Sequence, residues 1–187
     1  MKHEFVWVDL ETTGLLDYSP SGCYGDGKIL EWAIILADDG PIGNMTPVVQ
    51  ETGVITYNEQ LNLDDYTLKL HTESGLLSST GLSLKDSENI IIEILRKNYG
   101  SELKNLTLAG NTVHFDLQWI RRNMLELTKL IGYRIFDVST IQRMMESWYP
   151  GYKRVKKEIH RALPDILESL ENAKQCRELL KFESIGI

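Results

Sequence analysis

Two acidic residues end an apolar segment near the start of the chain and together could bind a metal ion. The segment from Phe5 to Glu11 is rich in β-branched and aromatic residues, which predicts a central β-strand. Residues i and i+2 of a strand point to the same face, so the Asp9 and Glu11 carboxylates should converge. Such carboxylates repel each other unless a cation lies between them, and Mg²⁺ takes oxygen ligands of this kind. The alternative is that both acids face solvent. The apolar character of the strand disfavours it, because burying a charged group costs free energy unless that group is paired.

A third acid, Asp116, follows a short apolar strand and a glycine turn. We predict the strand at Leu106 to Ala109, its end at Gly110-Asn111, and a helix from Phe115 to Ile131. Asp116 would then lie in the first helical turn, where the helix dipole stabilises a carboxylate. It is therefore either a simple helix-terminal acid or a further metal ligand.

His160 and Asp165 form the last candidate pair. Five residues along one helix are ~140° apart, so these two side chains could not share a helix face. Pro164 suits the first turn of a helix and places the helix start between them. His160 would then lie on a loop, where an imidazole can act as a general base near neutral pH. A solvated loop histidine is the alternative.

The remaining elements would position these residues. Strands come first and then alternate with helices, which predicts an α/β domain with a mixed sheet covered by helices. The further predicted elements are strands at Ile29–Ala37, Val48–Tyr57 and Arg134–Val138, and helices at Ser87–Asn98, Thr140–Trp148 and Pro164–Phe182. The segment from Ser19 to Gly27, rich in Gly, Pro and Ser, is predicted to be a surface loop.

Composition bounds the class of protein. The 187 residues suit one domain, 1–187, and 42% hydrophobic with 25% charged residues is typical of a globular chain. The net charge of −7 argues against a large phosphate-binding surface for long nucleic acid. It agrees with an enzyme that meets phosphate through metal ions held by carboxylates. The two cysteines, Cys23 and Cys176, are far apart and indicate free thiols in a reducing compartment. With no membrane-length apolar run, we expect a cytoplasmic protein.

Asp9, Glu11, Asp116, His160 and Asp165 together resemble the motif pattern of the DEDD 3′→5′ exonuclease superfamily, in its histidine (DEDDh, DnaQ-like) subclass. Longer stretches are similar to the oligoribonuclease family, and the likeness runs in register from about Phe5 to Leu180. Those stretches are Asp9–Leu15, His71–Leu76, Gly110–Asn111, Tyr133–Thr140 and His160–Ser169.

The resemblance implies a ribonuclease H-like mixed β-sheet flanked by α-helices, and a 3′→5′ exoribonuclease that hydrolyses very short oligoribonucleotides to 5′-mononucleotides. It implies two divalent ions, Mg²⁺ or Mn²⁺, with His160 as the general base. The implied ligands of the two ions are Asp9, Glu11, Asp116 and Asp165.

The resemblance also implies a binding site for short single-stranded RNA. By position, Leu15 would wedge between two bases, and Tyr66 stands where the family usually has a stacking tryptophan. Tyr133 would reach the site from a second subunit, which implies a homodimer. The residues that would close around the 5′ phosphate are His71, Thr112, Arg134, Ser139 and Thr140.

Several alternatives stay open at this point. Leu15 and Tyr66 could be core residues, and Arg134 a surface strand residue. Glu31 is either an acid that supports the metal ligands or part of a strand-end salt bridge. The basic run from Lys153 to Lys157 either touches substrate phosphate or is solvated. The rival functions are an exonuclease that trims longer DNA or RNA, and a catalytically silent nucleic-acid-binding protein.

Overall fold

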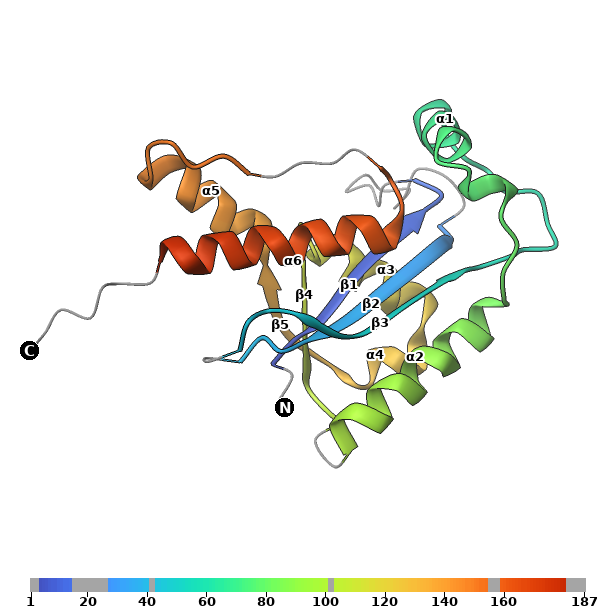
Figure 1. The fold of residues 1–187 in the computed structure, drawn as a ribbon. Helices are drawn as coiled ribbons and strands as arrows, with labels where there is room; N and C mark the ends of the chain where they lie inside the picture. The colour runs from blue at the N-terminus through green and yellow to red at the C-terminus, as the bar shows by residue number, and fades with distance from the viewer. Residues whose placement is uncertain (1–3, 15–26, 41–42, 101–102, 155–158, 181–187) are drawn as a thin grey trace, which may run out of the picture.

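Five β-strands form one mixed sheet in the order β3-β2-β1-β4-β5 (Figure 1). The computed structural model describes residues 4–14, 27–40, 43–100, 103–154 and 159–180. β1 pairs antiparallel with β2 and parallel with β4, while β2–β3 is antiparallel and β4–β5 is parallel. The strands are β1 (Val6–Thr12), β2 (Ile29–Ala37), β3 (Pro47–Val54), β4 (Leu106–Gly110) and β5 (Ile131–Asp137). The predicted central position of the first strand is confirmed.

Helices cover both faces of the sheet, as Figure 1 shows. One face packs apolar side chains against α2 (Leu84–Tyr99), α3 (His114–Asn123) and α4 (Leu125–Thr128). The other face packs against α5 (Val138–Trp148) and α6 (Ala162–Leu179). β2 is buried along its whole length because both faces are covered, which explains its unbroken apolar sequence. The predicted α/β class with a mixed sheet is therefore confirmed.

One predicted helix was wrong in its extent. Instead of running from Phe115 to Ile131, the chain leaves the helix at Met124 and starts a separate short helix, α4. A tertiary contact explains the new start, because Glu88 of α2 accepts hydrogen bonds from the backbone N–H groups of Glu126 and Leu127 at 2.7 and 3.1 Å. These are donors that a helix N-terminus leaves without intrahelical partners. The apolar spacing alone could not reveal a cap that comes from another helix.

Two short elements were not predicted, α1 (Asp65–Glu73) and η1 (Leu76–Ser78). α1 stands beyond the ends of β1 and β2 and packs few apolar side chains, so its sequence lacks a clear apolar stripe (Figure 1). The sequence feature that indicates α1 is its N-cap residue, Asp64, whose side chain accepts a hydrogen bond from the Thr67 N–H at 2.8 Å.

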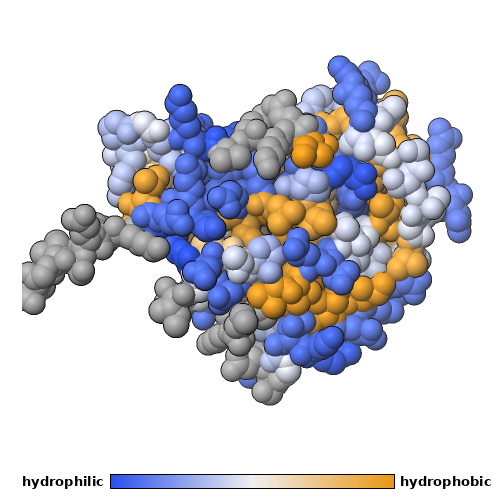
Figure 2. All heavy atoms as spheres, in the orientation of Figure 1, coloured by the Kyte–Doolittle hydropathy of each residue, from blue (hydrophilic) through white to orange (hydrophobic). Residues whose placement is uncertain are grey.

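The surface over α6 is a mosaic of hydrophilic and hydrophobic residues, with a hydrophobic band below α6 in the view of Figure 2. Within the described part of the chain, every helix is too short or too polar to cross a membrane. Cys176 is a buried free thiol on α6, whereas Cys23 lies outside the described residues.

Candidate active site

Three carboxylates meet where the C-terminal half of β1 approaches the N-terminus of α6. One oxygen each from Asp9, Glu11 and Asp165 lies within 4.8 Å of the other two. The strand alternation of β1 brings Asp9 and Glu11 to one face, as the sequence predicts. Asp165 joins them from the first turn of α6. Hard divalent cations such as Mg²⁺ favour oxygen donors of this type, so the donor set fits such an ion.

Asp116 lies behind this group, in the first turn of α3, where it is 8% exposed. Its Oδ1 accepts a hydrogen bond from the Leu10 N–H at 3.0 Å. Asp116 is thereby held against the strand residue that separates Asp9 from Glu11. This contact with β1 shows that Asp116 does more than stabilise the start of α3. It brings the fourth predicted carboxylate close to Asp9, Glu11 and Asp165, and we call these four acids the carboxylate cluster.

The electrostatics of the cluster favour protonation unless cations are bound. Burial, followed by the charge of Asp165, raises the pKa of Glu11 from 4.5 to about 8. Burial also raises the pKa of Asp116 from 3.8 to about 8 and that of Asp165 to about 6. The pKa of Asp9 is raised well above its ordinary value by burial and then by the Asp116 charge. Divalent cations would relieve both effects at once, because they supply positive charge to desolvated oxygens.

These shifts predict that the metal-free protein loses stability as pH rises. The unfolded Glu11 and Asp116 carboxyls titrate near 4.5 and 3.8, but the folded ones stay protonated up to about 8. Between those values the folded state binds more protons, so the free energy of unfolding falls with pH. We expect the Tm of the EDTA-treated protein to fall by several degrees from about pH 5 to about pH 9.

Mg²⁺ should restore most of that loss above about pH 7, and much less at pH 5, where protons compete for the same oxygens. Differential scanning fluorimetry across this range, with EDTA or with Mg²⁺, measures both effects. A Tm of the EDTA-treated protein that rises with pH would contradict the raised pKa values.

His160 lies at the junction of two clefts that open beside the carboxylates. One cleft is lined by Glu11, Gly14, Tyr66, His71 and His160. His160 sits in the left-handed backbone region at φ 53°, which non-glycine residues seldom adopt. It precedes α6, so the predicted loop position is confirmed, although α6 begins at Ala162, two residues before Pro164. The second cleft is lined by Asp9, Asn111, Thr112, Ser139, Gln142, Arg154, His160, Asp165, Glu168 and Ser169.

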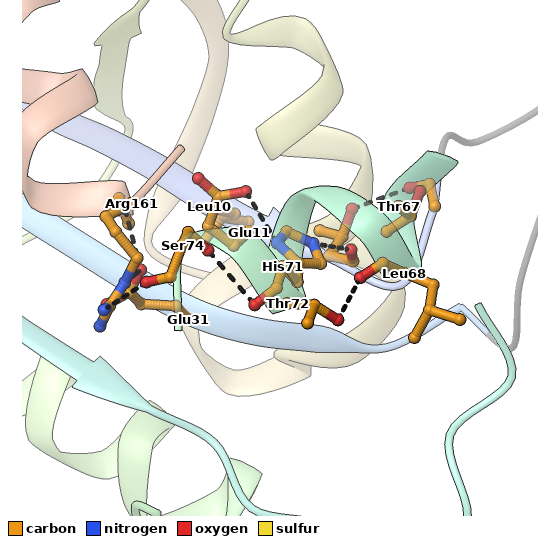
Figure 3. Close-up of polar contacts among 12 residues, drawn as sticks. Leu10, Glu11, Glu31, Thr67, Leu68, His71, Thr72, Ser74 and Arg161 are labelled. Atoms are coloured by element: carbon orange, nitrogen blue, oxygen red, sulfur yellow. Dashed lines mark hydrogen bonds and ion pairs between the residues drawn. The ribbon is translucent and has the colours of Figure 1, made fainter. Parts of the chain in front are cut away.

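The first cleft carries two of the predicted substrate residues on α1. Tyr66 is 72% exposed, which excludes the alternative that it is a core residue. His71 is 2% exposed, and its Nε2–H donates to the Thr12 carbonyl oxygen at 2.8 Å. Its Nδ1 lies 3.9 Å from a Glu11 carboxylate oxygen, as Figure 3 shows. Burial lowers the pKa of His71, which favours the neutral ring.

The second cleft carries Thr112 and Ser139, whose hydroxyl oxygens are 2.9 Å apart. Asp137 positions both residues, because its Oδ1 accepts from the Thr112 and Ser139 N–H groups at 3.1 and 2.9 Å. Asp137 is also the N-cap of α5. Sequence reasoning missed it, although an aspartate before Ser and Thr at a helix start is a recognisable capping signal.

The structure therefore divides the predicted phosphate-binding set. Thr112 and Ser139 lie together, whereas His71 lines the other cleft. Arg134 and Thr140 are exposed, and the Arg134 guanidinium carbon lies 5.2 Å from the Tyr133 ring centroid on β5. Tyr133, Arg134 and Thr140 are absent from the described linings of both clefts. Leu15 lies outside the described residues, as do 155–157 of the basic run.

Glu31, whose role the sequence left open, forms a partly buried ion pair with Arg161. It is 3% exposed on β2, and its carboxylate receives the Arg161 guanidinium, with Nη2 2.7 Å from Oε1. Both Glu31 carboxylate oxygens accept hydrogen bonds from the Arg161 side chain. The salt-bridge alternative for Glu31 is therefore the one that the structure shows. Arg161 was not singled out from the sequence.

The sequence matches the RNase_T exonuclease family over residues 6–172. It is 35% identical over 179 residues to a probable oligoribonuclease of Dictyostelium discoideum. This alignment covers 92% of this chain and 87% of that relative. It is 33% identical over 189 residues to an oligoribonuclease of Cutibacterium acnes. This alignment covers 97% of this chain and 88% of the relative.

Solved structures show the same fold. The Mg²⁺- and Mn²⁺-bound form of S. pombe Pop2p superposes with a TM-score of 0.60 and 15% identity over 94% of this chain and 83% of that one. The RNase domain of yeast Pop2 superposes with a TM-score of 0.62 and 10% identity. The match covers 95% of this chain and 78% of that one. At such identities the likeness concerns the fold alone, and it confirms the predicted ribonuclease H-like architecture.

Proposed function

Because the chain belongs to the RNase_T exonuclease family, we propose that it hydrolyses very short oligoribonucleotides from their 3′ ends to 5′-mononucleotides. The convergence of Asp9, Glu11 and Asp165 at the junction of two clefts carries this proposal. The relatives named oligoribonuclease support the substrate class. A cytoplasmic location stays a prediction.

The proposed mechanism is two-metal phosphodiester hydrolysis. Two Mg²⁺ or Mn²⁺ ions, when bound, would supply positive charge to lower the pKa of a water molecule and to stabilise the leaving 3′ oxygen. Asp9, Glu11 and Asp165 would hold these ions, with Asp116 as the fourth carboxylate against β1. His160 would accept the proton of the attacking water, because it faces both clefts beside the carboxylates. The metal-bound Pop2p structure supports the choice of ions.

The two clefts support a short substrate. Tyr66 offers an exposed aromatic ring for a base on one side of His160. Thr112 and Ser139 offer hydroxyl groups to a 5′ phosphate on the other side. Arg154 lines that second cleft and adds positive charge there. A site bounded in this way, on a chain of net charge −7, suits a few nucleotides better than a long polyanion.

We also propose a homodimer in which β5, at the sheet edge, faces the second subunit. Tyr133 on this strand is 77% exposed, and the Arg134 guanidinium packs over its ring. Contact with the second subunit would cover the exposed ring and bring Tyr133 to the substrate site of that subunit. Size-exclusion chromatography with light scattering measures the mass of the protein in solution. A monomeric mass at micromolar concentration would contradict the proposed homodimer.

The function is tested by comparing two RNAs. We expect rapid Mg²⁺-dependent loss of a 5′-phosphorylated diribonucleotide, slow attack on a 20-nucleotide RNA, and no cleavage in EDTA or by an Asp116→Ala variant. Preference for the long RNA would instead indicate a general exonuclease. Metal-independent binding of short RNA without turnover would support the silent binding protein, a function that retention of all five predicted catalytic residues disfavours.

A further inference from the structure

The backbone around His160 needs an external support. His160 has a left-handed φ of 53°, Arg161 is extended at φ −138° and ψ 136°, and α6 begins at the next residue. Three consecutive residues thus adopt three different backbone conformations. α6 also has no side-chain hydrogen bond from its own N-cap residue, Arg161. A segment of this kind keeps one conformation only when its surroundings hold it.

Glu31 supplies that support from β2. Its Oε1 accepts from Arg161 Nε and Nη2 at 3.1 and 2.7 Å, and its Oε2 accepts from Arg161 Nε at 3.0 Å. Oε2 also accepts from the Ala162 backbone N–H at 2.9 Å. Glu31 therefore caps the N-terminus of α6, where a negative charge is favoured by the helix dipole. Figure 3 shows Arg161 and Glu31 facing each other beside Ser74.

The pair connects the parts of the site. Glu31 lies directly opposite Glu11 in the β1–β2 ladder, so it has a fixed position relative to the carboxylate cluster. Arg161 follows His160 directly, and Asp165 follows one helical turn later. Arg161 Nη1 also lies 3.5 Å from the Ser74 carbonyl oxygen at the C-terminal end of α1, the helix that carries Tyr66 and His71.

We propose that Arg161 is a positioning residue that acts through Glu31 to hold His160 and Asp165 in place over Asp9 and Glu11. The proposal rests on the proposed function for its kinetic readout. Arg161 is 30% exposed at its side chain, but its guanidinium is bound to a Glu31 side chain that is only 4% exposed. The pair therefore combines a geometric constraint with neutralisation of a buried charge close to the cluster.

The chain offers a matched control on the same helix. Arg177, near the other end of α6, donates from Nη2 to the Gly43 carbonyl oxygen at 2.6 Å. Arg177→Gln should therefore reduce stability without moving the N-terminus of α6. Arg161→Lys keeps the charge but loses the planar guanidinium, so it should give an intermediate result.

The test measures kcat and KM for the variants Arg161→Gln, Glu31→Gln, the double variant, Arg161→Lys and Arg177→Gln. The substrate is whichever of the diribonucleotide and the 20-nucleotide RNA the wild type cleaves. We expect Arg161→Gln to lower kcat on the order of tenfold to a hundredfold while KM changes less than about threefold. The double variant should lie close to the worse single variant, because either change alone already breaks the Arg161–Glu31 pair. Arg177→Gln should keep kcat within about twofold.

Hydrogen exchange of a peptide covering 159–166 provides an independent readout. Exchange there should rise in Arg161→Gln and Glu31→Gln, but not in Arg177→Gln. Wild-type kcat in a folded Arg161→Gln variant, or losses that multiply in the double variant, would overturn the positioning role. The length preference of the wild type decides the proposed function separately. A wild type that cleaves neither RNA would overturn both proposals.

Discussion

An Asp9→Asn variant is expected to lose at least about a thousandfold in kcat while becoming more stable in the absence of metal. The loss in rate follows because Asp9 is one of three carboxylates whose oxygens lie within 4.8 Å of each other. An amide keeps the size of the side chain but removes the negative charge that a divalent ion requires. A thousandfold loss corresponds to about 4 kcal/mol of transition-state stabilisation.

The gain in stability follows from the same cluster. Burial, followed by the charges of Asp116, Glu11 and Asp165, raises the pKa of Asp9, so its ionised form is unfavourable in the folded protein. Removing that charge should raise the Tm in EDTA above about pH 7, and it should abolish most of the stabilisation by Mg²⁺. Opposite effects on rate and on metal-free stability distinguish a metal ligand from a residue that merely supports the fold.

Kinetics on the diribonucleotide and thermal unfolding with EDTA or Mg²⁺ measure the two effects. Asp86→Asn is the matched control, because Asp86 is exposed in the first turn of α2, which packs on the sheet face opposite α6. It should keep kcat within about twofold. An Asp9→Asn enzyme with more than a tenth of the wild-type kcat would contradict the assignment of Asp9 as a ligand.

The sequence is most informative where the chemistry depends on local periodicity. Asp9 and Glu11 could be placed on one face because a strand alternates every two residues. His160 and Asp165 could be separated because Pro164 suits the first turn of a helix. In both cases the spacing along the chain determines the geometry within a few residues, so no tertiary contact is needed to predict it.

Prediction was less informative where distant residues decide the structure. The break at Met124 depends on Glu88, which caps α4 from α2. The Arg161–Glu31 pair joins residues 130 positions apart, so neither side chain reveals its partner in the sequence. α1 escaped prediction because it covers no apolar core, although it carries Tyr66 and His71 at the first cleft. Capping signals such as Asp64 would have been the better guide there.

A His160→Asn variant should lose on the order of a hundredfold to ten-thousandfold in kcat, the usual contribution of a general base. Asparagine is the sharpest replacement because the backbone at this position is left-handed, at φ 53°. Asparagine tolerates that conformation better than most residues do, so the variant removes the imidazole and retains the backbone. His160→Gly is a second variant that accepts the same φ and carries no side chain.

Stabilisation by Mg²⁺ separates His160 from the carboxylates. Since Asp9, Glu11 and Asp165 remain in place, His160→Asn should keep the wild-type increase in Tm with Mg²⁺ above about pH 7. Affinity for an uncleaved diribonucleotide analogue should change less than about threefold. His114→Asn, a change at a histidine that is 40% exposed beside Asp137, is the control and should keep kcat within about threefold.

The joint pattern of the two variants identifies the role of each residue. Loss of kcat together with the Mg²⁺-dependent Tm increase in Asp9→Asn, and loss of kcat alone in His160→Asn, would assign metal binding and proton transfer separately. If His160→Asn also lost the stabilisation by Mg²⁺, His160 would act as a metal ligand, and the proton would need another acceptor. If it kept wild-type kcat, the left-handed backbone at the junction of the clefts would have no catalytic purpose, and the two-metal mechanism would have to proceed without a histidine base.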